Sequence, residues 1–73
     1  MRRYTILVTP EDGAYVVDVP ALPGCYSIGD TLDEAIQNAQ EAIALYLETL
    51  KSRGEPIPEE TEHPRAIVVE VAA

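Results

Sequence analysis

Cysteine, histidine, aromatic residues and long apolar runs are all scarce in this 73-residue chain. Cys25 is the only cysteine and so has no partner for an intrachain disulfide. His63 is the only histidine, which leaves too few ligands for a Cys/His zinc site. No apolar run is long enough to span a membrane, and no export signal is recognisable. We therefore expect a cytoplasmic protein that uses no cofactor and no metal.

Basic residues are also few: five lysines and arginines stand against thirteen acidic residues, giving a net charge of -8. Such a surface repels phosphate backbones, so we expect no direct binding to nucleic acid. The acidity can serve solubility, or it can face a basic protein partner. Composition alone leaves both explanations open.

The small size predicts a single domain over residues 1–73. A chain this short buries only about 60% of the surface that it exposes when unfolded, so its stability alone is marginal. Small domains gain stability from disulfides, a metal, self-association or unusually good helix packing. Because this chain lacks the residues for the first two, self-association is the remaining route unless the helix packing is unusually good. We therefore expect a homo-oligomer.

Alternating side chains predict an N-terminal hairpin. Tyr4–Thr9 and Ala14–Val19 have the period-two pattern of strands, and Pro10–Gly13 has the composition of a turn. A register that places Thr9 opposite Ala14 gathers apolar side chains on one face, which we assign to the core. These residues are Tyr4, Ile6, Val8, Tyr15, Val17 and Val19.

A short third strand and a long helix follow the hairpin. The third strand is expected at about Cys25–Ile28. Thr31 and Glu34 have the spacing of a capping box, in which each side chain accepts a hydrogen bond from the backbone of the other. Apolar residues then recur every three or four positions up to Arg53, and Gly54 suits the position after a helix end.

The last part of the chain predicts an extended connector and a fourth strand. Glu55–Pro64 is acidic and rich in proline, whereas Arg65–Val71 alternates β-branched residues. A crossover through the helix would place the fourth strand parallel to the first and beside it. The expected fold is therefore α+β, β-β-β-α-β, with a small mixed sheet of order 3-2-1-4 and the helix on one face.

Six segments, in this order and spacing over Tyr4 to Pro58, resemble the HicB-like antitoxin family. They are Tyr4–Val8, Asp12–Val17, Val19–Cys25, Gly29–Ala35, Ala42–Leu47 and Gly54–Pro58. The resemblance implies a degraded RNase H-like fold and a role in neutralising a small HicA-like toxin that cleaves mRNA. Many members carry a further C-terminal DNA-binding domain, which we do not expect within these residues. A toxin that holds RNA must be basic, which suits an acidic antitoxin.

Two sets of residues are candidates for binding. Acidic side chains with expected exposure are the candidates for contact with a basic toxin: Glu11, Asp12, Asp18, Glu41 and Glu48. Side chains on the sheet face away from the helix, or in the third strand, are the candidates for an oligomer interface: Leu7, Val16, Tyr26 and Val68. A stand-alone structural or regulatory homo-oligomer without a toxin partner remains the alternative function.

Catalysis is not expected. A metal-dependent nuclease needs carboxylates that converge on metal ions, but the strands of Asp18 and Glu70 are separated by the first strand in the expected order. Glu34 is assigned to the capping box. Cys25 has no base near it in the sequence, and a buried, inert thiol is the simpler assignment.

Overall fold

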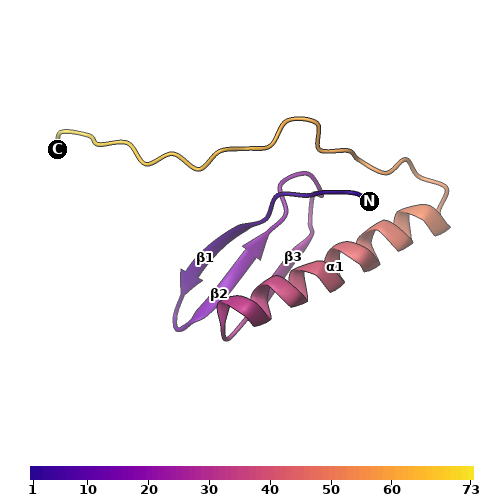
Figure 1. Ribbon diagram of the computed structural model, residues 1–73, viewed down its shortest axis with the longest axis horizontal. Helices are drawn as coiled ribbons and strands as arrows, with labels where there is room; N and C mark the ends of the chain where they lie inside the picture. The colour runs from indigo at the N-terminus through magenta and orange to yellow at the C-terminus, as the bar shows by residue number, and fades with distance from the viewer.

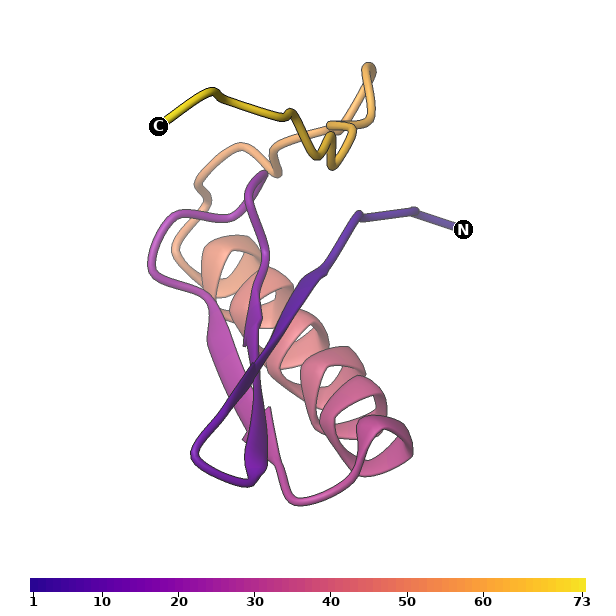
Figure 2. The same cartoon turned by 90° about the vertical axis from the view of Figure 1, so that its left-hand side faces the viewer.

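The computed structural model describes residues 1–73 as a three-stranded sheet, one helix and a long C-terminal segment without regular structure (Figure 1). The elements are β1 (Leu7–Glu11), β2 (Ala14–Asp18), β3 (Tyr26–Gly29) and α1 (Leu32–Ser52). The sheet is antiparallel with the order β1-β2-β3. Figure 2 shows α1 lying along one face of the sheet, where it packs mainly on β3 and then on β2. The α+β class is confirmed.

The hairpin is tighter than the sequence pattern predicts. Glu11 lies opposite Ala14, and Asp12 and Gly13 form a two-residue turn with φ angles of 49° and 80°. Positive φ at both turn positions is typical of a type I′ turn, whose twist matches that of the flanking strands. The expected register, with Thr9 opposite Ala14, is therefore wrong by two residues. A shift of two preserves the face of every side chain, so the predicted core face survives.

Pro10 lies inside β1, opposite Tyr15, and not in the turn. Hydrogen-bonded and open pairs alternate along an antiparallel ladder, and the Glu11–Ala14 pair closes the turn. Pro10 thus occupies an open pair, where its nitrogen faces away from β2. An edge strand tolerates a proline at such a position because no ladder hydrogen bond is lost.

The core consists of two small apolar clusters between the sheet and α1. Val17 packs with Ala35 and Ala39, and all three side chains are fully buried. The second cluster joins Val19 and Leu22 to Cys25, whose exposed fraction is only 4%. Cys25 is therefore the buried apolar thiol that the sequence predicts.

Small residues let α1 approach β3 closely. A Cβ atom built on Gly29 would lie 2.4 Å from the backbone nitrogen of Ala35. No side chain fits there, so the position requires glycine for reasons of space. The helix begins where predicted: the Thr31 hydroxyl accepts from the Glu34 N–H at 3.1 Å. The Glu34 carboxylate, however, accepts from the N–H of Asp30 at 3.3 Å.

The C-terminal end of α1 also follows the prediction. Gly54 has a φ of 68°, and two backbone hydrogen bonds after Arg53 close a Schellman motif. The helix is amphipathic, with its apolar stripe toward the sheet. No helix in the chain combines the length and apolar character required to cross a membrane.

The predicted fourth strand does not form in this chain. Residues 65–71 have no strand partner and are exposed, Val68 to 97%. The order 3-2-1 is therefore present without its fourth member. Figure 1 shows the reason: the segment runs past the sheet and away from it, and a strand exists only where another strand supplies hydrogen bonds. Alternation in the sequence reports strand propensity but not the presence of a partner.

The connector before this segment is fixed to the residues that precede β1. The Tyr4 hydroxyl donates to the Pro58 carbonyl at 2.5 Å. The Glu60 carboxylate accepts from the Thr5 backbone N–H at 2.9 Å and from the Thr5 hydroxyl at 2.6 Å. His63 contacts the same carboxylate through Nδ1. We refer to Thr5, Glu60 and His63 as the connector clasp.

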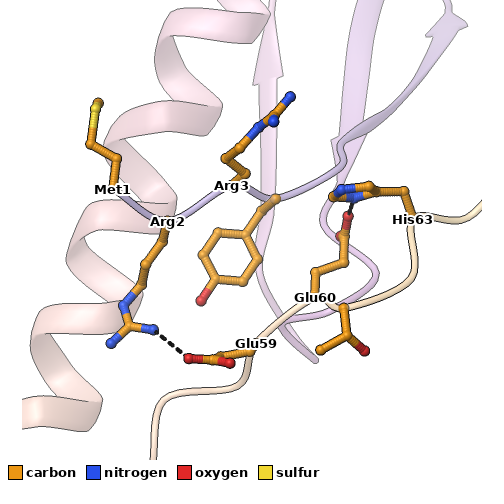
Figure 3. A pocket seen from close by; sticks show the side chains of 8 residues that line it. Met1, Arg2, Arg3, Glu59, Glu60 and His63 are labelled. Carbon is orange, nitrogen blue, oxygen red and sulfur yellow. Dashed lines mark hydrogen bonds and ion pairs between the residues drawn. The ribbon is translucent and has the colours of Figure 1, made fainter.

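A polar hollow lies between the N-terminal residues and the connector (Figure 3). Arg2 points across it and pairs with Glu59 at 3.6 Å. Both side chains are largely exposed, so this ion pair adds little to stability. Glu60 and His63 of the clasp line one side of this hollow.

Replacing Gly29 should destabilise the fold strongly. We expect Gly29→Ala to lower the free energy of unfolding by about 2 kcal/mol, because the new methyl group meets helix backbone that cannot rotate away. Urea unfolding followed by circular dichroism measures the effect. Ser27→Ala in the same strand is the matched control and should change stability far less. Equal stabilities for the Gly29 variant and the parent chain would contradict the close packing.

The connector clasp should open in acid. The pKa of Glu60 is lowered from its ordinary value of 4.5, first by the hydrogen bond from the Thr5 side chain, while burial opposes this and the Thr5 N–H and His63 add to it. A lowered pKa means that the clasp stabilises the fold above pH 4.5 and that this contribution is lost as the pH falls below it. The protection of the Thr5 amide should then fall, measured by NMR as the exchange rate relative to that of an unstructured amide at the same pH.

Two glutamine variants separate the clasp from general acid effects. Glu60→Gln should speed exchange of the Thr5 amide already at neutral pH, because the amide oxygen accepts more weakly than a carboxylate. Glu62→Gln, in the same exposed part of the connector, should leave it unchanged. An identical Thr5 exchange rate in all three chains would show that the clasp does not form.

Candidate binding site

The sheet face opposite α1 is uncovered and carries two rows of side chains. Residues that pair across the strands share a face, which gives the rows Leu7–Asp18–Tyr26 and Thr9–Val16–Ile28. Val17, next to Val16 in the sequence, is buried under the helix, which fixes the assignment of the two faces. We call these six residues the open face.

Apolar side chains on the open face are well exposed. Tyr26 is 65% exposed and Ile28 is 59% exposed, and they are neighbours on β3. The Leu7 side chain on β1 is 37% exposed, and Val16, on the strand between β1 and β3, is half-buried. Tyr and Ile side chains held by a rigid sheet lose little entropy on binding, so they suit a protein interface.

Three of the four residues predicted for an oligomer interface share this face, namely Leu7, Val16 and Tyr26. The fourth, Val68, lies in the C-terminal segment outside the sheet. Ile28 is the residue that sequence reasoning missed. Its place two positions after Tyr26 in a short strand was the available signal, since such positions share a face.

The five acidic candidates divide between the two layers of the molecule. Glu11 and Asp18 have the strand parity of the open face, and Asp12 is in the adjoining turn. Glu41 and Glu48 are exposed on α1, in the layer on the other side of the sheet. One flat partner surface cannot cover both groups, so the structure does not bring the five together.

The free edge of β3 is partly blocked. Asn38 on α1 donates from Nδ2 to the Ile28 carbonyl at 2.8 Å, which occupies a backbone acceptor on that edge. Beside it, a shallow groove runs between the start of β3 and the second half of α1, with Tyr26 on one wall and Leu45 on the other. The Tyr46 hydroxyl, which donates to the Pro23 carbonyl at 2.9 Å, fixes this end of the helix.

The titratable groups form no recognisable catalytic arrangement. The structure contains no group of three or more His, Cys, Asp and Glu side chains able to hold a metal ion. Burial, and second the Asp18 carboxylate, raise the pKa of the Cys25 thiol. A raised pKa keeps the thiol protonated at neutral pH, whereas a nucleophile requires the thiolate.

Known proteins similar to this chain share both its sequence and its fold. The family described as "HicB_like antitoxin of bacterial toxin-antitoxin system" matches residues 4–69. A UPF0150 protein of Thermoplasma acidophilum is 54% identical over 57 residues, which are 77% of this chain and 83% of that protein. A UPF0150 protein of Synechocystis is 52% identical over 59 residues, 80% of this chain and 75% of the relative.

Solved structures give the same result. The crystal structure of the Burkholderia pseudomallei antitoxin HicB has a TM-score of 0.75 at 30% identity, covering 99% of this chain and 75% of that one. The crystal structure of the N-terminal domain of that antitoxin gives 0.71 at 41% identity, over 85% and 72% of the two chains. A structure described as the "HicA3 and HicB3 toxin-antitoxin complex" gives 0.72 at 30% identity, over 84% and 71%. The family predicted from the motifs is thereby confirmed, and this chain belongs to the HicB-like antitoxins.

Proposed function

We propose that this chain neutralises a basic, RNA-binding toxin of the HicA kind by covering its RNA-binding face in the cytoplasm. The observation that carries the proposal is the open face, where exposed Tyr26 and Ile28 share a side of the sheet with Asp18 on the neighbouring strand, and Glu11 at the end of β1 has the same strand parity. The relative solved in a toxin–antitoxin complex supports a partner of this class. Binding would be steric and electrostatic, without a catalytic step by this chain.

Charge complementarity supports a basic protein as the partner. The chain has a net charge of -8, and a protein that holds RNA needs a basic surface. Opposite potentials accelerate encounter and disfavour wrong partners, while a desolvated apolar centre holds the complex together. The open face combines apolar side chains from all three strands with the Asp18 carboxylate, which lies on β2 between Leu7 and Tyr26. α1, which carries Glu41 and Glu48, supplies acidity with two exposed large apolar side chains, Leu32 at its start and Leu45 in its second half.

The degraded RNase H-like fold implied by the resemblance belongs to the same proposal. An RNase H-like sheet without its catalytic carboxylates would keep a binding surface and lose metal chemistry. Asp18 is the only acidic side chain among the six residues of the open face. A lone carboxylate suits an ion pair with an arginine or lysine of a toxin better than a two-metal site.

Two matched double variants, each replacing two carboxylates with uncharged amides, test whether the sheet or the helix contacts the toxin. Glu11→Gln with Asp18→Asn removes two charges from the open-face side, and Glu41→Gln with Glu48→Gln removes two from α1. We expect the first pair to weaken binding of a catalytically inactive HicA-type toxin at least about tenfold, because its charges lie at the contact. The second pair should change affinity far less, since its charges act only at long range. Calorimetric titration measures both.

Two controls accompany these titrations: the salt dependence of the affinity and the helix content of each variant. Affinity of the parent chain should fall with added salt, and the first pair should show a shallower salt dependence than the second. Circular dichroism should show the same helix content in all variants. A larger loss from the helix pair would contradict the open face as the site, and failure to bind any basic RNA-binding protein encoded beside this chain would favour the stand-alone oligomer.

A further inference from the structure

The C-terminal segment Arg65–Val71 has the properties of a strand without a partner. Ile67, Val69 and Val71 alternate with Val68 and Glu70, and all of these side chains are exposed. β-Branched residues in this pattern fit a pleated, half-buried surface. A contiguous row of exposed apolar side chains indicates a surface that binds a partner. Arg65 and Glu70 cancel in charge, so the segment is neutral in an otherwise acidic chain.

The sheet offers one open edge, on β1. Val8 and Pro10 fall at the open pairs of the β1–β2 ladder, so the backbone groups of Val8 and the carbonyl of Pro10 face outward. The opposite edge is less accessible, because Asn38 occupies the Ile28 carbonyl. The core side of β1 is also incompletely covered: α1 packs on β3 and β2, and Val8 remains only half-buried.

We propose that Arg65–Val71 of one copy adds as a strand to the outer edge of β1 in a second copy, and that the exchange is reciprocal. Ile67, Val69 and Val71 then cover the core side of the partner's β1. Val68 and Glu70 extend the open face beside Leu7 of the second copy. The edge of β1 from Leu7 to Pro10 is four residues long, close to the length of the apolar part of the segment, and the missing N–H of Pro10 ends the ladder.

The connector explains why the acceptor is a second copy. The clasp holds Glu60 and His63 against Thr5, at the start of β1 in the same chain. Pro64 follows at once, and a residue before proline is held extended, so His63 does not turn the chain back. The segment consequently leaves the body, as Figure 1 shows. A short, stiff hinge of this kind favours exchange over closure within one chain.

The area involved suits a stable dimer. An aliphatic side chain of this size buries roughly 100 Å² when it is covered. Each copy contributes four large apolar side chains, Ile67, Val68, Val69 and Val71, which are 72% to 97% exposed. Together with the surfaces that they cover, the two strands exceed the roughly 1,000 Å² expected of a specific interface. Neutrality of the segment means that docking adds no repulsion to two acidic bodies.

Light scattering after size-exclusion chromatography tests for the dimer. The full chain should elute with twice its monomer mass of 8.0 kDa. Val69→Asp should be monomeric with unchanged helix content, because a charge on the core side of the added strand cannot be buried unpaired. Ala73→Asp, which adds the same charge beyond the strand, should stay dimeric. A monomeric parent, or a Val69→Asp variant that still dimerises, would overturn the proposal.

Mixed cysteine cross-linking tests for exchange itself. A Leu7→Cys chain and a Val68→Cys chain, each retaining the buried Cys25, are unfolded and refolded together and then oxidised. Neighbouring strands lie close enough for a disulfide or a very short bridge, so a covalent heterodimer should accumulate. Lys51→Cys in place of Val68→Cys should give little. Absence of the heterodimer, with a Leu7→Cys/Val68→Cys double variant forming an internal bridge as a monomer, would show closure within one chain and refute exchange.

Discussion

The close contact between α1 and β3 is the constraint on which the rest of the structure depends. Gly29 and Ala35 have almost no side chain at the contact, and the helix backbone therefore lies directly on the strand. With so few residues, the chain has one helix and uses it on one face of the sheet. The other face stays uncovered, so Tyr26 and Ile28 on β3 remain exposed.

Local signals in the sequence predicted the local structure well. Thr31 and Glu34 located the start of the helix, and Gly54 located its end, because capping involves residues only a few positions apart. The hairpin register was missed since Pro10 suggested a turn, while the positive φ angles of Asp12 and Gly13 made a tighter one. The fourth strand was predicted but does not form, for a different reason: pairing is non-local, and alternation at Arg65–Val71 does not show that a partner strand is available.

The candidate site was predicted only in part, because residues within one sheet follow a local rule whereas residues of different elements do not. Strand parity does not depend on a register shift of two, so Leu7 and Val16 lie on one face as expected. Tyr26 was assigned only to the third strand, and the pairing of β3 with β2 places it on that same face. Strand parity says nothing about how residues of the helix lie relative to residues of the strands, so it could not group the acidic residues. Their assignment to one surface rested on charge alone, and the structure places Glu41 and Glu48 in the helix layer, away from Asp18.

We propose that this HicB-like antitoxin binds a HicA-type toxin with the sheet face that its single helix leaves uncovered. NMR titration of the isotope-labelled chain with an inactive HicA-type toxin tests it most directly. Amide signals of Thr9, Val16, Tyr26 and Ile28 should shift or broaden, while those around Glu41 and Glu48 keep their positions. The reverse pattern, with changes confined to α1, would contradict the account.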